Sequence, residues 1–499
     1  MDLLHNLSFG FGVAFSLQNL AYCIVGVTVG TLIGVLPGIG PLATIAMLLP
    51  ITYNVAPVGA LIMLAGIYYG AQYGGSTTAI LVNLPGETSS VVTCIDGYQM
   101  ARQGRAGPAL AIAAIGSFFA GTVGTLLIAL FGPPLAEFAL KFGAPEYFSL
   151  MLMGLVAAAV LAEGDMIRSL AMVGMGLLLG IVGTDVNTGM PRFSFGITEL
   201  TDGIGFVVVA VGVFAVGEII NNLGETTDRQ VFTSAIKSLM PTREDIKASI
   251  GPILRGTGLG AFFGILPGTG PAVASLSSYM VEKKLAADPS RFGRGAIEGV
   301  AGPESANNAD AQCKFIPMLT LGLPASGVMA LMLGALTIQG IQPGPEVMTL
   351  RPELFWGLVA SMWIGNLMLV VLNLPLVGVW VRILKVPYRL LFPAIMTFSA
   401  IGIYSVSNSA VDVYLAALFA GVGFVWIKLG FNPAPMLLGF VLGPMLEENL
   451  RRAMLMSGGD PSVFVRHPIS LFFIVATALI LLAMVVPALR RRREQVASS

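Results

Sequence analysis

The sequence predicts an all-α polytopic membrane protein, built as two inverted structural repeats with re-entrant helical hairpins and about 10–12 transmembrane helices. Three observations predict this class. Hydrophobic residues make up 55% of the 499 residues and charged residues only 11%, whereas a soluble chain carries about a quarter charged residues. Apolar stretches long enough to span a bilayer recur along the whole chain. A short phrase rich in glycine and proline occurs once in each half.

Ten stretches of mostly apolar residues have the length of about 20 residues that a spanning helix needs. They are 58–82, 108–131, 146–163, 169–186, 204–222, 315–340, 356–381, 390–406, 411–430 and 468–489. Lysine and arginine favour cytoplasmic loops, so they orient the chain. We therefore expect the polar connector after residue 222, the loop with Arg102 and Arg105, and the C-terminus with Arg490–Arg493 to be cytoplasmic.

The polar connector divides the chain into two halves. We expect a first transmembrane repeat at 1–222, a cytoplasmic connector at 223–250, a second transmembrane repeat at 251–489 and a cytoplasmic basic tail at 490–499. Basic residues occur in 282–295 after the second phrase, but not in 53–57 after the first. Two related halves inserted in opposite directions would have this exchange of basic loops. The alternative is that two similar phrases arose by chance in a glycine-rich chain.

The repeated phrase reads Gly-Val-Leu-Pro-Gly-Ile-Gly-Pro at 34–41 and Gly-Ile-Leu-Pro-Gly-Thr-Gly-Pro at 264–271. Proline lacks an N–H donor and glycine weakens a helix, so the phrase predicts a break. In a membrane such a break must face protein or a water-filled cavity. The second phrase lies between two cytoplasmic ends, on limbs too short to span the bilayer. We therefore expect it at the tip of a re-entrant hairpin and, by symmetry, the first phrase at a tip entering from the other face.

Each phrase precedes a new helical run, and a helix N-terminus offers unpaired N–H groups and partial positive charge. Two such termini meeting inside the membrane would suit an anion such as a carboxylate, and we expect the polar residues after each phrase to contact it. The predicted substrate-binding residues are Pro37, Gly38, Gly40, Gly75, Ser76, Thr77, Thr78, Pro267, Gly268, Thr269, Gly270, Ser305, Asn307 and Asn308. The alternative for the hydroxyl side chains is a bond to their own helix or a neighbouring one.

Ionisable residues within a membrane are candidates for function. The predicted ion-binding residues are Asn83, Glu87, Glu304 and Asp310. The alternative is that 304–314 lies at the cytoplasmic surface with solvated charges. His5 and His467 lie at opposite ends of the chain and the three cysteines are scattered, so we expect no cofactor and no metal beyond sodium as a coupling ion. The motifs of zinc proteases, serine hydrolases and P-loop enzymes are absent, and we expect no enzyme activity.

Four motifs together resemble one known family over nearly the whole chain. They are the paired Leu-Pro-Gly-x-Gly-Pro phrases, Tyr69–Ser76, Asn83–Glu87 and Pro303–Ala309. They are similar to the large membrane subunit of the tripartite tricarboxylate transporters. The resemblance implies import of tri- or dicarboxylates such as citrate across the bacterial inner membrane, driven by an ion gradient, typically sodium, without ATP. It also implies two partners, a small four-helix membrane subunit and a periplasmic substrate-binding protein.

The chain departs from that family at two places. Residues Asp310–Phe315 replace small, glycine-rich residues, and Ala325 replaces the glycine expected after Leu323-Pro324. We expect the added Lys314 to pair with Asp310 or with an acidic substrate. We expect transport by alternating access, with a moving-domain (elevator) version by analogy. The competing interpretations are an anion channel and an intramembrane enzyme.

Overall fold

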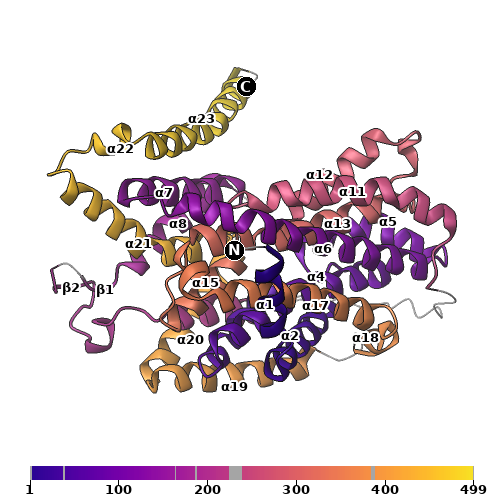
Figure 1. Ribbon diagram of the computed structural model, residues 1–499, viewed down its shortest axis with the longest axis horizontal. Helices are drawn as coiled ribbons and strands as arrows, with labels where there is room; N and C mark the ends of the chain where they lie inside the picture. The colour runs from indigo at the N-terminus through magenta and orange to yellow at the C-terminus, as the bar shows by residue number, and fades with distance from the viewer. Residues whose placement is uncertain are drawn as a thin grey trace.

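The computed structural model describes residues 3–36, 40–162, 165–185, 188–223, 239–383 and 388–497, and most of these residues are helical (Figure 1). The first half contains α1 (Leu3–Ala14), α2 (Leu17–Val35), α3 (Pro41–Thr52), α4 (Pro57–Val82), η1 (Thr88–Ser90), α5 (Val91–Arg102), α6 (Ala106–Ala139), α7 (Ala144–Leu161), α8 (Met166–Gly180), β1 (Gly183–Thr184), β2 (Pro191–Arg192), η2 (Thr198–Leu200), α9 (Phe206–Ala210), η3 (Val211–Val216) and α10 (Gly217–Leu223). The two short strands pair antiparallel. The predicted all-α class is confirmed.

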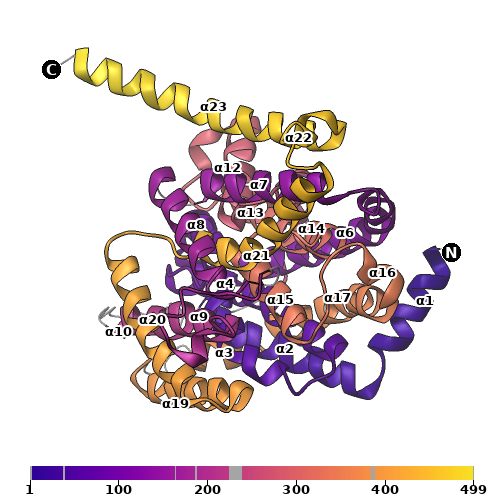
Figure 2. The ribbon, with the colours of Figure 1, turned by 90° about the vertical axis from the view of Figure 1, so that its left-hand side faces the viewer.

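All the secondary-structure elements described in the second half are helices, joined by loops. They are α11 (Arg243–Ile265), α12 (Pro271–Leu285), η4 (Pro289–Arg291), α13 (Glu298–Cys313), α14 (Phe315–Leu321), α15 (Gly327–Ile338), α16 (Glu346–Leu350), α17 (Pro352–Asn373), α18 (Val377–Ile383), α19 (Tyr388–Ser407), α20 (Ala410–Lys428), α21 (Ala434–Met456), α22 (Val463–Arg466) and α23 (Pro468–Ala497). The last helix, α23, lies along the outside of the molecule against α7 (Figures 1 and 2).

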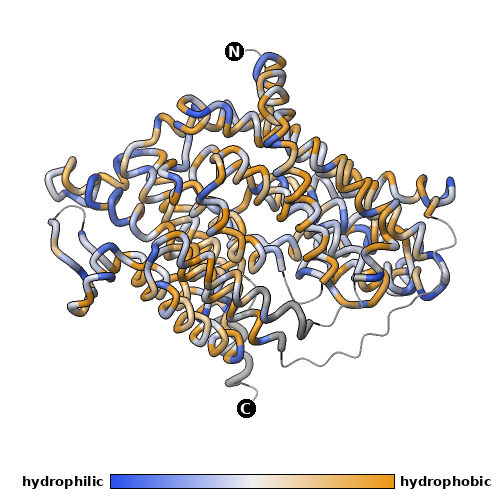
Figure 3. Tube along the Cα trace, turned by 90° about the horizontal axis from the view of Figure 1, so that it is seen from below, coloured by the Kyte–Doolittle hydropathy of each residue, from blue (hydrophilic) through white to orange (hydrophobic). Residues whose placement is uncertain are grey.

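Five of the described helices are long and apolar enough to cross a membrane: α2, α6, α7, α17 and α20. Hydrophobic residues run along most of the chain (Figure 3). Many large apolar side chains are exposed on the outer surface, among them Phe131, Phe262 and Leu418. Such extensive apolar exposure is unusual for a soluble monomer and is expected where lipid covers the protein. The chain is a multi-pass membrane protein.

The structure differs from the predicted boundaries at four places. The stretch 356–381 is divided, because α17 ends at Asn373 and α18 begins at Val377. The stretch 315–340 is divided, because α14 ends at Leu321 and α15 begins only at Gly327. The stretch 169–186 is helical only to Gly180. Helix α11 begins at Arg243, inside the segment expected to be connector, because the Thr242 side chain accepts a hydrogen bond from the Asp245 N–H and starts the helix. The repeat and connector boundaries themselves stay a prediction.

Glycine stripes hold two pairs of helices close together. In α2 a glycine at every fourth residue faces the backbone of α4, and in α11 a glycine at every fourth residue faces the backbone of α13. These glycines are Gly26, Gly30, Gly34, Gly256, Gly260 and Gly264, and a Cβ on any of them would lie 2.1–2.7 Å from a backbone oxygen of the facing helix. The two stripes are 230 positions apart, as are the two phrases that follow them. Small residues permit this close helix approach in membranes.

The α11–α12 pair is a hairpin whose two ends lie at the same end of the molecule. Arg105, just before α6, forms an ion pair with Asp245 in the first turn of α11. Gln103 donates to the Arg294 carbonyl oxygen, which follows α12, at 2.8 Å. The chain therefore enters through α11, turns at 266–270 and returns through α12 to the level where it began. That this hairpin, predicted for 253–281, re-enters a membrane stays a prediction.

Candidate functional site

The second phrase folds into a tight turn between α11 and α12. Leu266 is extended (φ −82°, ψ 126°), as the proline after it requires, and Gly268 has φ +81°. Thr269 Oγ1 donates to the Phe263 carbonyl oxygen at 2.6 Å, which satisfies an acceptor at the end of α11. The Gly268 N–H donates to the Ala325 carbonyl oxygen at 2.9 Å. The turn is thereby attached to the segment that joins α14 and α15.

The first phrase shows the same geometry where it is described. Leu36, before Pro37, is extended (φ −91°, ψ 101°) and ends α2. Gly40 (φ −73°, ψ 169°) precedes α3 as Gly270 (φ −77°, ψ 153°) precedes α12. In both helices proline is the first residue, where its missing N–H costs nothing. Pro37 and Gly38 lie outside the described residues.

A second break follows in each half and repeats the correspondence. Helix α4 ends at Asn83 (φ 57°) before Leu84-Pro85, and α14 ends at Gly322 (φ 68°) before Leu323-Pro324. Left-handed residues stop a helix, and the proline that follows prevents its continuation. The chain then restarts as a helix after Glu87 in the first half and after Ser326 in the second. Each half therefore has two breaks at matching places.

All four breaks line one cavity of about 580 Å³. Its wall includes Gly40 from the first break, Gly86 from the second, Gly268 from the third and Ser326 from the fourth. Four α-helices of twelve or more residues begin at this wall directly after a loop: α3, α12, α15 and α21. Helix α5 also starts there, at Val91, but it continues from η1 and its Val91 N–H is bonded to the Thr88 carbonyl oxygen. The first-turn N–H groups of the four helices have no partners within the helix, and their dipoles place partial positive charge at the cavity.

Few polar side chains line the cavity. Among the described residues in its wall, Glu87 is the only one with a formal charge, and neither lysine nor arginine is present. Tyr68 and Gln72, one helical turn apart on α4, are buried, and Tyr68 Oη and Gln72 Nε2 have no hydrogen-bond partner within the described structure. Two unpaired donors therefore belong to residues that line a space into which four helix N-termini also open. Burying a donor without an acceptor is costly, so a ligand with oxygen acceptors fits this cavity.

Glu87 connects the cavity to a buried polar cluster on α13. It accepts hydrogen bonds from Ser89 Oγ and from Asn307 Nδ2, the latter at 3.4 Å. One turn earlier on α13, Glu304 accepts from Ser76 Oγ at 2.5 Å and from Thr93 Oγ1. The Asn307 Oδ1 atom has no partner in the described part of the chain. Glu87 and Glu304 are thus two carboxylates without a basic partner, an arrangement that a bound cation would stabilise.

Asp310 and Lys314 form an ion pair on the same helix, and both side chains are fully buried. Their burial, with that of Glu304, excludes the alternative that 304–314 is a solvated surface segment. Lys314 pairs with Asp310, one of the two partners expected for it. The second carboxylate oxygen of Asp310 has no partner among the described residues.

The predicted site residues divide into groups. Gly40, Gly268, Thr269, Gly270 and Glu87 line the cavity. Other predicted residues that the structure describes contact protein instead. Pro267 lies in the tip, Gly75 packs beside Glu87, and Asn83 is an exposed helix end. The side chains that form hydrogen bonds within their own helix or to a neighbouring helix are those of Ser76, Thr78, Ser305 and Asn308, and Thr77 lies with Ser76 at a much smaller void. Contact of any of these residues with a substrate stays a prediction. Pro37 and Gly38 lie outside the residues that the structure describes.

Sequence reasoning missed several contributors to the cavity wall. Tyr68, Asn221, Ser326 and Asn432 carry polar groups there, and α21 contributes its N-terminus. Gln72 belongs to the polar residues that were expected to contact a ligand after the first phrase. Helix α21 had a signal, because Asn432-Pro433 precedes it and Asn432 Oδ1 accepts from the Ala434 N–H at 3.0 Å. Its charged second half prevented its recognition as an apolar span.

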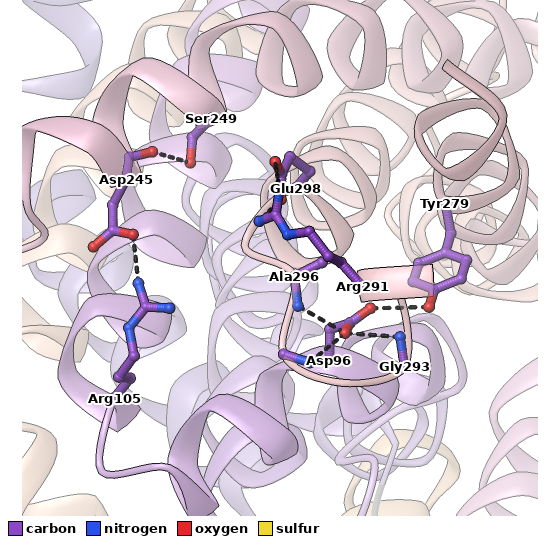
Figure 4. Close-up of polar contacts among 10 residues, drawn as sticks. Asp96, Arg105, Asp245, Ser249, Tyr279, Arg291, Gly293, Ala296 and Glu298 are labelled. Atoms are coloured by element: carbon purple, nitrogen blue, oxygen red, sulfur yellow. Dashed lines mark hydrogen bonds and ion pairs between the residues drawn. The ribbon is translucent and has the colours of Figure 1, made fainter. Parts of the chain in front are cut away.

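A different polar cluster joins the two halves away from the cavity (Figure 4). Asp96 of α5 is buried and accepts hydrogen bonds from the N–H groups of Gly293, Gly295 and Ala296 at 2.7–2.9 Å. Its second oxygen accepts from Tyr279 Oη at 2.9 Å. All four donors belong to the second half of the chain. Because both oxygens of this carboxylate accept hydrogen bonds from the protein, the cluster is structural and attaches α5 to α12 and to the segment between α12 and α13.

Comparison with known proteins gives a family match and two relatives. The family model described as "Tripartite tricarboxylate transporter TctA family" matches residues 20–438. An Agrobacterium vitis protein named "Uncharacterized 52.8 kDa protein in TAR-I ttuC' 3'region" is 59% identical over 497 residues, which cover 99% of both chains. A second from the same organism, "Uncharacterized protein in TAR-II ttuC' 3'region", is 56% identical over 237 residues, 48% of this chain and 98% of the relative. No solved structure gives a significant match.

Proposed function

Since this chain belongs to the tripartite tricarboxylate transporter TctA family, as its large membrane subunit, we propose that it imports tri- or dicarboxylates through the cavity described above. The observation that supports this proposal most strongly is the meeting of four helix N-termini at one cavity whose described wall residues include no basic side chain. Main-chain N–H groups and helix dipoles stabilise a carboxylate there. The unpaired donors of Tyr68 and Gln72 add two hydrogen bonds.

We propose that the two halves are inverted repeats that expose the cavity alternately to each face, in an elevator-type motion. Two breaks at matching places in each half, and two matching glycine stripes, support the repeat. The C-terminus is cytoplasmic and the membrane is the bacterial inner membrane in this proposal. The loops that contain Arg102, Arg105 and Arg294 lie together at one end of the molecule, which agrees with a common cytoplasmic side.

Uptake in this proposal is coupled to a cation gradient, with sodium as the ion. Glu87 and Glu304 have hydroxyl or amide donors but no basic partner, and Asn307 Oδ1 is free within the described structure. A cation entering beside Glu87 would neutralise the one negative charge in the wall of an anion cavity. The proposed partners are a small four-helix membrane subunit and a periplasmic substrate-binding protein, as the family implies.

The test is uptake of radiolabelled citrate and succinate into proteoliposomes that contain this chain and the small membrane subunit. We expect uptake only when the periplasmic binding protein and an inward sodium gradient are both present. Uptake that ignores both sodium and proton gradients would contradict coupled transport. A substrate current that persists without any coupled ion would favour the channel instead.

A further inference from the structure

The side chains of Gln72, Ser89 and Glu87 share a single hydroxyl hydrogen, which belongs to Ser89. Gln72 and Glu87 line the cavity. Ser89 Oγ lies 2.9 Å from Gln72 Oε1 and also contacts Glu87 Oε1. Both contacts require Ser89 to donate, yet a hydroxyl group carries one hydrogen. Gln72 Nε2 has no partner within the described structure, so nothing else fixes the orientation of this amide. The chain Gln72–Ser89–Glu87 therefore has two hydrogen-bond arrangements, and the charge on Glu87 selects between them.

In the first arrangement Glu87 is a bare carboxylate and takes the Ser89 hydrogen. The Ser89 oxygen is then an acceptor, so the Gln72 amide turns its N–H₂ toward Ser89 and its carbonyl oxygen toward the cavity. In the second arrangement a cation neutralises Glu87, and Ser89 donates to Gln72 Oε1 instead. The Gln72 N–H₂ then faces the cavity. A carboxylate ligand is repelled by the carbonyl oxygen and bound by the N–H₂.

We propose that Gln72 transmits cation binding at Glu87 to the substrate, by presenting a donor to the cavity only when Glu87 is neutralised. This inference rests on the proposed function, because it needs an anionic substrate in the cavity. Gln72 is a switching contact, whereas Tyr68, one turn away on α4, offers its hydroxyl group in both arrangements. Cation and substrate thus favour each other's binding without touching, which is the reciprocity that coupled transport requires.

No described charged residue near Gln72, Ser89 and Glu87 takes the place of the incoming cation. Asn307 of α13 contacts Glu87 but is neutral. Lys314, the buried base on α13, is paired with Asp310. Glu304 accepts from Ser76 and Thr93 and adds negative charge. The described surroundings of Glu87 therefore leave it without a positive partner, and either a proton or a sodium ion would supply one.

The experiment measures the affinity of the reconstituted complete transporter for citrate and succinate at increasing sodium concentration and fixed pH. A second series lowers the pH in sodium-free buffer. For the unmodified protein we expect the Kd to fall about fivefold or more in one series, and that series identifies the cation. Gln72→Met should bind more weakly and lose this dependence. Ser89→Ala should lose it as well, because the Gln72 amide is then disconnected from Glu87.

The matched control is Gln312→Met. Gln312 is also a buried glutamine with an unpaired side-chain atom, but it lies outside the cavity wall, so cation dependence should be retained. Full cation dependence in both Gln72→Met and Ser89→Ala would overturn the inference. So would an unmodified protein whose Kd responds to neither series. Failure of the unmodified protein to bind either acid under any condition would instead refute the proposed function on which the inference rests.

Discussion

Gly268 offers the sharpest test of the cavity, because a single methyl group there has no room. An added Cβ would lie 2.3 Å from the Ala158 Cα of α7, about 1 Å short of ordinary van der Waals contact. The backbone φ of +81° at this position is also less favourable for alanine than for glycine, by roughly 1–2 kcal/mol. Overpacking against backbone adds about 1–3 kcal/mol. The tip therefore moves by about 1 Å in Gly268→Ala, or the hydrogen bond from Gly268 to Ala325 breaks.

Either change displaces the start of α12 from the cavity. Losing charge-assisted hydrogen bonds to a carboxylate costs about 1.5–3 kcal/mol, which is a factor of about 10 to 100 in affinity. We expect the KM of uptake to rise by that factor in Gly268→Ala, with normal amounts of protein in the membrane. The assay is initial-rate uptake of labelled substrate into proteoliposomes, with protein amount measured in the same vesicles.

Gly258→Ala is the matched control in the same hairpin. A Cβ at Gly258 meets nothing within 4 Å, and alanine in a helix is favoured by about 1 kcal/mol over glycine. Uptake should be unchanged. Should Gly268→Ala fail to fold, Thr269→Val loosens the same tip without a clash, because it removes only the hydroxyl group that contacts the Phe263 and Leu266 carbonyl oxygens. Normal KM values in both tip variants would refute the assignment of this turn to the substrate cavity.

Three further predictions concern named contacts. Tyr68→Phe should leave thermal unfolding unchanged, since Tyr68 Oη has no partner among the described residues, and should raise the KM about 2- to 10-fold; a lower melting temperature with unchanged KM would contradict this. Lys314→Met should destabilise the protein by about 3–5 kcal/mol in denaturant unfolding, because it leaves Asp310 unpaired. The double variant Lys314→Met with Asp310→Leu should recover most of that loss. Equal instability of the single and the double variant would refute the pairing. Asp96→Ala should destabilise by more than about 3 kcal/mol, because three N–H groups lose their hydrogen bonds to a buried carboxylate, against about 1 kcal/mol for Tyr279→Phe. Thermal unfolding that ranks the two variants in reverse would contradict the structural role.

Hydropathy and helix-breaking residues predicted much of this fold. The spans 58–82 and 411–430 agree with α4 and α20 to within two residues, because continuous apolar runs leave few other options in a membrane. Helix α13 was not predicted as a span because of its many polar side chains, and the sequence left open whether 304–314 is buried or solvated. In the structure Glu304 and Asp310 are satisfied by partners far away or one turn along, and only the fold shows those partners.

The candidate site was predicted in its main-chain part and not in its side chains. Glycine and proline have local conformational consequences, so the tip at 267–271 could be located from its own residues. Whether Ser76 or Gln72 faces the cavity depends on how α4 is rotated against α2 and α13. That rotation follows from packing of helices far apart in the chain. An apolar helix that is buried on all sides, as α4 is, carries no periodicity that would reveal it.

The four helix starts at the cavity have an evolutionary consequence. Their N–H groups belong to the peptide backbone, so no substitution other than one to proline deletes them. Descendants of this protein are free to vary wall residues such as Val213 or Phe214 and so admit metabolites of other shapes, while keeping their attraction for negative charge. Selectivity and charge preference can therefore diverge at different rates among such carriers.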